Sequence, residues 1–199
     1  MTTLVLASQS AARRALLAAA GVPHEAVAPQ VDEDSAKAAL RAEGHDARQL
    51  ADALAELKAL RLSRRLPGAF VLGCDQTLAL DDGTLFDKPD GRPGAEAQLR
   101  ALRGRRHTLT SAAVVCQNGT PVWRAVDTAK LTMRDFSDAF LADYLDREGA
   151  AIGACVGGYR LEGLGVQLFA RVEGDHFTIL GLPLLPLLDW LRVRGVIRA

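Results

Sequence analysis

Two long β-rich stretches joined by Asn118-Gly119 constrain the fold of this chain more than any other feature of its sequence. Residues 107–117 and 120–133 are rich in β-branched and apolar side chains. Asn-Gly between two such stretches is the strongest short-range signal for a β-hairpin. The sequence therefore predicts two long antiparallel strands, which an all-parallel sheet does not accommodate.

Strands and helices alternate along the rest of the chain. Apolar patterning predicts strands at residues 3–7, 24–28, 69–80 and 166–172. Helical spacing and capping residues predict helices at residues 10–21, 47–65, 94–104, 136–149 and 181–195. Residues 29–35 and 155–165 are expected to be loops. This order predicts an α/β protein with a mixed, twisted sheet, flanking helices and a cleft between two lobes.

Length, charge and cysteine content restrict the class of protein. The 199 residues suit one domain over residues 1–199, and 24 basic and 24 acidic side chains give no net field for nucleic acid. Three widely spaced cysteines argue against a disulfide framework and fit a reducing compartment. The apolar runs are shorter than the ~20 residues of a membrane span. We therefore expect a cytoplasmic protein with no membrane segment and no nucleic-acid partner.

The first strand-helix joint, LVLASQSAARRALL, combines two hydroxyls and two guanidinium groups at a helix N-terminus. Exposed N–H groups and the helix dipole favour phosphate there, with Ser8, Ser10 and Arg13 as ligands. The alternative is that Ser10 is only an N-cap and that Arg13 and Arg14 lie on a solvated face. The joint alone leaves both interpretations open.

Asp75 is the sharper signal, because it interrupts an apolar strand in which a carboxylate loses its hydration. Glu33 offers a second carboxylate, and Lys58 and Lys88 offer cationic groups. Two carboxylates for a hard cation such as Mg²⁺, together with Arg13 and the lysines for phosphates, are what cleavage of a nucleoside triphosphate needs. The sequence has no GxxxxGK[ST], HExxH or GxSxG motif, which argues against P-loop, zinc and serine hydrolases.

Seven blocks resemble the Maf family of nucleoside triphosphate pyrophosphatases in order and across nearly the whole chain. They are LVLASQSAARRALL, VDE, LAELKA, LGCDQ, DKP, LRGRRHTLTS and the tail from GGYRLEGLG to GLPLL. The match is closest to the subgroup that acts on 7-methyl-GTP, which has Asp-Gln and Glu-Gly where other branches have Asp-Thr and Gln-Gly. Gln76 and Glu162 place the chain there.

The resemblance implies a Maf/ITPase-like fold, with two lobes around a nucleotide cleft, that hydrolyses the bond between the α- and β-phosphates. It implies Asp75 as the catalytic carboxylate, with Glu33 as its partner in binding a divalent metal cation, Mg²⁺ or Mn²⁺. It further implies that the triphosphate is seated by Ser8, Ser10, Arg13, Lys58 and Lys88. The expected partner is the nucleotide substrate, and a homodimer is a further expectation.

Specificity is expected to involve Ala12, Gln76 and Glu162. Ala11 and Ala12 stand where the family usually has proline and, in some members, a bulky residue, which removes a stacking contact to the base. Cys155 stands where lysine is frequent. The carboxylate of Glu162 suits the two adjacent N–H donors of guanine, and methylation at N7 strengthens that interaction by adding positive charge.

A second function from a different class is a non-catalytic nucleotide-binding regulator of cell division or septum formation. A binding module keeps its phosphate contacts without needing a carboxylate that activates water. Retention of Asp75, Glu33 and Lys88 together therefore favours the enzyme. Pyrophosphate release from a panel of nucleotides distinguishes the two.

Overall fold

The computed structural model describes residues 3–198, and the chain forms two compact units. Unit 1 comprises the chain up to Gln76, Thr110–Asp127 and the chain from Asp175 on. Unit 2 comprises Thr77–Leu109 and Thr128–Gly174. One domain over residues 1–199 stays a prediction.

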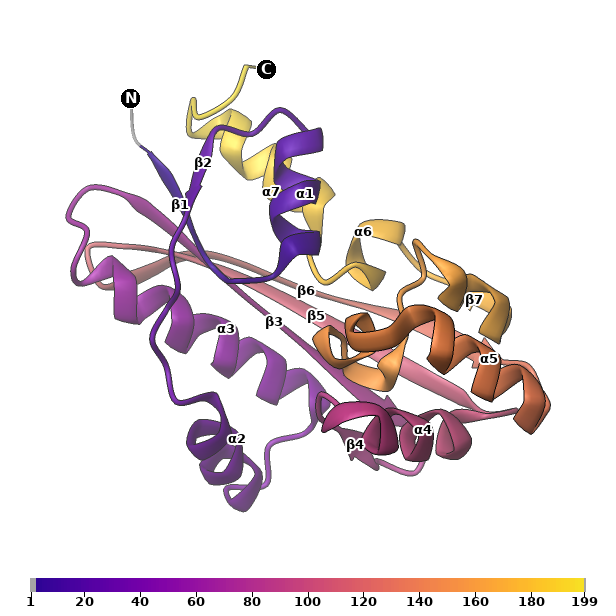
Figure 1. The fold of residues 1–199 in the computed structure, drawn as a ribbon. Coiled ribbons are helices and arrows are strands. Elements are labelled where there is room, and N and C mark those ends of the chain that lie inside the picture. Colours follow the sequence, from indigo (N-terminus) through magenta and orange to yellow (C-terminus); the bar gives the residue numbers. More distant parts are fainter. Residues whose placement is uncertain (1–2, 199) are drawn as a thin grey trace. The chain divides into compact units, whose positions relative to one another are not determined.

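Helices and strands alternate as the sequence predicts (Figure 1). The strands are β1 Leu4–Ala7, β2 His24–Ala26, β3 Phe70–Leu80, β4 Leu85–Phe86, β5 Arg106–Gln117, β6 Thr120–Met133 and β7 Phe169–Glu173. The α-helices are α1 Ala11–Ala19, α2 Glu33–Ala42, α3 Ala47–Ser63, α4 Gly91–Leu102, α5 Asp138–Glu148, α6 His176–Ile179 and α7 Leu184–Val193. Short 3₁₀ segments are η1 Gly149–Ala154, η2 Val156–Gly158 and η3 Leu164–Leu168.

The sheet is mixed, which confirms the predicted fold class. Its strand order is β2-β1-β3-β5-β6-β7, and β4 pairs with β3. Strand β1 runs parallel to β2 and β3, whereas β4 and β7 are antiparallel to their neighbours. The hairpin between β5 and β6 turns at Asn118 and Gly119, which have φ of 52° and 75°. Two positive φ angles are what an Asn-Gly hairpin turn requires.

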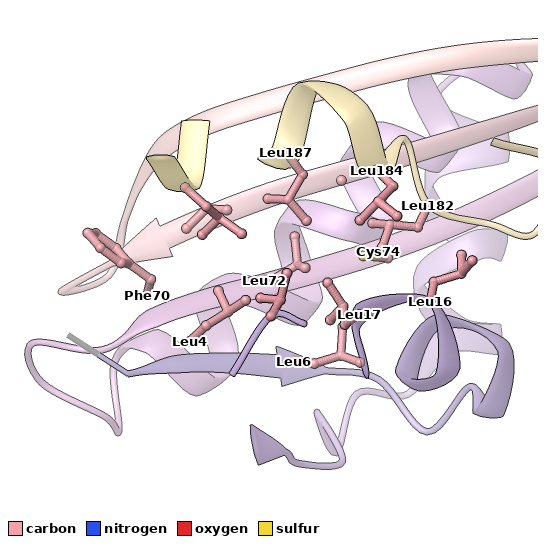
Figure 2. Close-up of a cluster of buried hydrophobic side chains, with 14 residues drawn as sticks. Leu4, Leu6, Leu16, Leu17, Phe70, Leu72, Cys74, Leu182, Leu184 and Leu187 are labelled. Carbon is pink, nitrogen blue, oxygen red and sulfur yellow. The ribbon is translucent and has the colours of Figure 1, made fainter. Parts of the chain in front are cut away.

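Helices cover both faces of the strands of unit 1. Leucines of α1 and α7 pack on one face of β1 and β3, where Figure 2 shows Leu17 and Leu187 meeting Leu6 and Leu72. Alanines of α3 pack on the opposite face. Each fully buried leucine contributes about 1.5 to 3 kcal/mol. This packing fixes the end of β1, which Ser8 follows, and the middle of β3, which carries Asp75 and Gln76.

Small residues allow α3 to lie directly on β3. A Cβ atom on Gly73 would be 2.1 Å from the Ala55 carbonyl oxygen and 2.7 Å from the Ala59 nitrogen. Side chains alternate along a strand, so Asp75 shares the face of Gly73 that α3 covers. Cys74 and Gln76 point to the other face.

Unit 2 has an aromatic core around a buried histidine. His107 Nε2 lies 2.7 Å from the Tyr159 hydroxyl, and the ring of Phe169 packs against both. Burial lowers the pKa of His107 to about 4, so the ring is neutral near pH 7. His107 is therefore a core residue of unit 2.

The basic run RGRR of unit 2 is balanced by acidic neighbours. Arg103 pairs with Asp138, Arg105 with Asp82, and Arg106 with Asp81. All three aspartates are largely exposed, so each pair adds little stability. Their effect is to cancel local positive charge.

Three local predictions are wrong. Residues 29–35 are not all loop, because Asp32 caps the Ser35 amide and α2 begins at Glu33, where acidic side chains suit the helix dipole. The predicted strand at 166–172 begins only at β7, since residues 164–168 form η3, where Gly165 packs against the backbone of Arg160. The predicted helix at 181–195 begins later, at Leu184, and α6 precedes it.

Among the helices of residues 3–198, none is both long and apolar enough to cross a membrane.

Candidate active site

Unit 1 holds an ion triad formed by Lys58, Asp75 and Glu33. Lys58 lies on α3, Asp75 on β3 and Glu33 at the first position of α2. Lys58 Nζ is 2.7 Å from Asp75 Oδ1 and 2.9 Å from Glu33 Oε2. Lys58 and Asp75 are each only 5% exposed, so water screens their charges far less than those of a surface pair. Three of the residues chosen from the sequence therefore meet in one unit.

The second carboxylate oxygen of Asp75 has no partner in the described structure. Asp75 Oδ2 is buried and accepts no hydrogen bond from any described residue. An unsatisfied buried acceptor costs about 1 to 3 kcal/mol, more if it is charged. Such an atom is placed to accept a proton from water or to bind a cation.

The triad carries two negative charges and one positive charge. Within residues 3–198, no three histidine, cysteine, aspartate or glutamate side chains come together as a metal site. A hard cation such as Mg²⁺ needs only one or two carboxylates when phosphate oxygens and water complete its octahedron. The donor set of Asp75 and Glu33 fits such a cation.

Helix α1 begins with the predicted N-cap, and the arginine in its first turn is hydrogen-bonded within unit 1. Ser10 is the N-cap of α1, and its hydroxyl accepts from the Arg13 amide at 3.3 Å. Arg13 does not lie on a solvated face. Its Nε donates to the Gly181 carbonyl at 2.8 Å, and its Nη1 donates to the Cys74 carbonyl at 3.1 Å and to Ser8 Oγ at 3.4 Å.

The Cys74 carbonyl connects the helix to the triad along the chain, because Cys74 directly precedes Asp75. The Cys74 thiol is fully buried, and this burial raises its pKa to about 11. The thiol therefore stays protonated and is no nucleophile. Arg14, the neighbour of Arg13, is exposed.

Gln76 is half-buried on the face of β3 opposite Asp75. Its Nε2 donates to the Ile179 carbonyl at 2.9 Å, to Ser111 Oγ at 3.0 Å and to the Thr178 carbonyl at 3.2 Å. The side-chain contacts of Gln76 thus run to the backbone of α6 and to β5. Ala12 is also half-buried, one residue before Arg13.

Unit 2 carries the other two predicted residues, Lys88 and Glu162, both exposed. Both lie near Cys155. Burial raises the pKa of the Cys155 thiol, Glu162 raises it further, and Arg160 and Lys88 oppose the rise. The Cys155 thiol, with its raised pKa, is protonated near pH 7.

The loop that carries Glu162 is fixed by an ion pair that the sequence did not reveal. Arg160 donates from Nε and Nη2 to Glu148 Oε2 at 3.0 and 2.8 Å, and Glu148 is only 8% exposed. Fork-like arginine-carboxylate pairs are geometrically specific. The pair holds the chain two residues before Glu162.

Comparison with known proteins shows the family to which the chain belongs. The family model described as Maf-like protein matches residues 3–194. A nucleoside triphosphate pyrophosphatase of Sphingopyxis alaskensis is 54% identical over 194 residues, covering 98% of both chains. Proteins of the same name from Caulobacter vibrioides and Rhodospirillum rubrum are 54% and 55% identical, covering 99% and 98% of this chain and 98% and 96% of their own. The chain belongs to the Maf-like protein family.

Proposed function

We propose that this protein is a nucleoside triphosphate pyrophosphatase that hydrolyses the bond between the α- and β-phosphates. The observation that carries the proposal is Asp75, a buried carboxylate with one oxygen held by Lys58 and the other without a hydrogen-bond partner. The names of the relatives support the same reaction.

Asp75 acts as the base in this proposal. Its Oδ2 accepts a proton from the water that attacks the phosphate, while Lys58 holds Oδ1 and keeps the carboxylate oriented. Arg13 binds phosphate oxygens at the N-terminus of α1, where Ser8 and Ser10 add hydroxyl groups. Positive groups that face developing charge lower the barrier, because they are already oriented before the reaction starts.

A divalent cation belongs to the same proposal, with Asp75 and Glu33 as its protein ligands. Mg²⁺ or Mn²⁺ at these carboxylates, when bound, neutralises phosphate charge and increases the acidity of nearby water. The net negative charge of the triad attracts the cation. Lys88, in unit 2, is proposed to bind the pyrophosphate that leaves.

The test is product analysis with purified protein, Mg²⁺ or Mn²⁺ and a panel of normal and modified nucleoside triphosphates. We expect equal amounts of nucleoside monophosphate and pyrophosphate. Release of inorganic phosphate and a nucleoside diphosphate would contradict the proposed position of cleavage. Tight nucleotide binding without turnover across the panel would instead support the alternative, a non-catalytic regulator of cell division.

For the base, we propose a guanine nucleotide methylated at N7, with Glu162 as the acceptor for the guanine N1–H and N2 amino groups. Two adjacent donors match one carboxylate, whereas uracil and thymine offer a single donor between two acceptors. The ion pair between Arg160 and Glu148 supports this assignment, because it restrains the loop on which Glu162 lies. Ala12 is the other proposed specificity position.

Glu162→Gln is expected to lower kcat/KM for 7-methyl-GTP by about 1.5 to 3 kcal/mol of transition-state binding, the usual contribution of a charged hydrogen bond. Activity toward UTP and dTTP should fall less or rise, because an amide suits their edges better. Steady-state kinetics with all three nucleotides measure this. Glu173→Gln, the same change on β7, is the matched control. Equal proportional losses for all nucleotides would show that Glu162 acts only through its loop.

Arg13→Ala is expected to weaken the binding of nucleotide and of inorganic pyrophosphate at least about tenfold, because it removes a guanidinium cation from the helix N-terminus. Arg14→Ala is the matched control and should change binding less than about twofold, since its exposed side chain points about 100° away around the helix. Calorimetric titration with pyrophosphate measures both. Equal losses in the two variants would contradict the assigned roles.

A further inference from the structure

The short helix α6 and the turn that follows it are held by side chains from three other elements of unit 1. We call residues 176–182 the α6 turn. The last carbonyl groups of a helix lack partners within the helix and need them elsewhere. Gln76 from β3, Ser111 from β5 and Arg13 from α1 all donate to carbonyl oxygens of this turn.

Gln76 contacts two carbonyl groups of the α6 turn and also Ser111. Its Nε2 donates to the carbonyls of Thr178 and Ile179 at 3.2 and 2.9 Å. Ser111 Oγ, fully buried, donates to the same Thr178 carbonyl at 2.7 Å and accepts from Gln76 at 3.0 Å. Because an amide nitrogen has two hydrogens, these contacts occupy its donor capacity within the protein.

Thr178 is also held through its amide and its hydroxyl group. Asp175 Oδ2 caps the turn by accepting from the Thr178 amide at 2.8 Å. Thr178 Oγ1, on a fully buried side chain, lies 2.9 Å from Asp127 Oδ2 on β6. Thr178 is therefore bonded through its carbonyl, amide and hydroxyl groups. Of the residues that donate to the turn, Gln76 lies nearest to Asp75 in sequence.

The turn in turn holds Arg13. The Gly181 carbonyl accepts from Arg13 Nε at 2.8 Å. Gly181 has a φ of 96°, and a Cβ atom there would lie 3.3 Å from Arg13 Nε and Nη2. The positive φ favours glycine, and a Cβ atom there would crowd the guanidinium group. The hydrogen bonds of Arg13 to described residues use Nε and Nη1, which leaves the N–H groups of Nη2 for an anion.

We propose that Gln76 is a positioning residue for the phosphate seat, by which we mean Arg13 with Ser8 and Ser10 at the N-terminus of α1. Gln76 acts on Arg13 through the α6 turn and not by contact with the nucleobase. The part of this inference that concerns the substrate rests on the proposed function. Cys74 and Gln76 lie on one face of β3, on either side of Asp75 in sequence, and both connect to Arg13: Cys74 through its carbonyl and Gln76 through the turn. Strand β3, which carries the proposed general base Asp75, thus also positions Arg13, the proposed ligand of the phosphates.

The test replaces the donor of Gln76 and measures the turn and the seat separately. Gln76→Glu is nearly isosteric and places an oxygen against two carbonyls. Gln76→Met removes the donors without adding charge and serves if the first variant folds poorly. Gln117→Glu is the matched control. Gln117 lies on β5, and its side chain also donates to a backbone carbonyl, that of Gly68. All are compared at pH 8 by circular dichroism before use.

Hydrogen exchange of the ligand-free protein reports on the turn. The amides of residues 178–182 should exchange at least about tenfold faster in both Gln76 variants than in wild type or Gln117→Glu, as expected when a hydrogen bond that holds them is lost. Unchanged exchange in both variants would overturn the inference.

Binding of inorganic tripolyphosphate, which has no base, reports on the seat. The dissociation constant should rise about tenfold in both Gln76 variants, in proportion to the rise in KM for every nucleoside triphosphate, whichever base it carries. Adding Gln76→Glu to Arg13→Lys should raise the dissociation constant of tripolyphosphate little beyond that of Arg13→Lys alone, because the two changes break one chain of contacts. A loss confined to nucleotides with one type of base would overturn the inference and return Gln76 to base recognition. Failure of the wild-type protein to bind tripolyphosphate would overturn the proposed function instead, while exchange still decides whether Gln76 holds the turn.

Discussion

Asp75→Asn is expected to lower kcat for nucleoside triphosphate hydrolysis at least about a hundredfold while the protein remains folded. The amide keeps an oxygen that accepts from Lys58, so the ion triad loses one charge but not its geometry. The group opposite that oxygen can no longer take a proton from water. Single-turnover kinetics of pyrophosphate release and the urea unfolding curve measure the two effects.

Asp52→Asn is the matched control. Asp52 lies on α3 and pairs with Arg124, so the same chemical change falls in unit 1 outside the proposed site. It should leave kcat within about twofold, as expected of a substitution that removes no acid–base group. An Asp75→Asn protein that retains more than a tenth of the wild-type kcat would show that another group activates the water.

Lys58→Met is expected to lower the free energy of unfolding by about 3 to 5 kcal/mol, because it leaves Asp75 buried without its counterion. The Asp75 carboxylate is 5% exposed, so water replaces the ammonium group poorly. Urea unfolding measures the loss. Lys130→Met, on an exposed position of β6, is the control and should cost less than about 1 kcal/mol.

The same variant tests the proposed metal ligands. Without the ammonium group, Glu33 and Asp75 lose the positive charge that they share, so Mn²⁺ should raise the melting temperature of Lys58→Met more than that of wild type. Adding Glu33→Gln to the variant should abolish the extra shift. An equal Mn²⁺ effect in wild type, Lys58→Met and the double variant would place the cation elsewhere.

The fold was predictable where its signals are local. Asn118-Gly119 defines its hairpin because few residues other than these tolerate positive φ. Ser137 is the N-cap of α5, a position at which serine is favoured. Helix α2 was missed because its short sequence is polar on average, and none of its residues is buried. Asp32 was its visible signal, since aspartate is favoured at the N-cap, where it accepts from the amide three residues later, here that of Ser35.

The site was predictable only in part, for a related reason. Asp75 stands out because a carboxylate in an apolar strand needs a partner, and that partner is Lys58. Gly181 left no such signal. It contacts Arg13 through a backbone carbonyl, 168 residues away in sequence, and a carbonyl group is common to every residue type. Contacts to the backbone across such distances depend on the packing of the whole unit.

Gly73 limits how this sequence can diverge. Any side chain there would collide with the backbone of α3, which lies at this point directly on β3. Lys58 reaches Asp75 at 2.7 Å from a helix that is held this close. An ancestor that lost this glycine would have moved the helix and separated the pair before any charged residue changed. We therefore expect lineages that keep the Lys58–Asp75 pair to keep glycine at position 73, although a hydrogen atom takes no part in the chemistry.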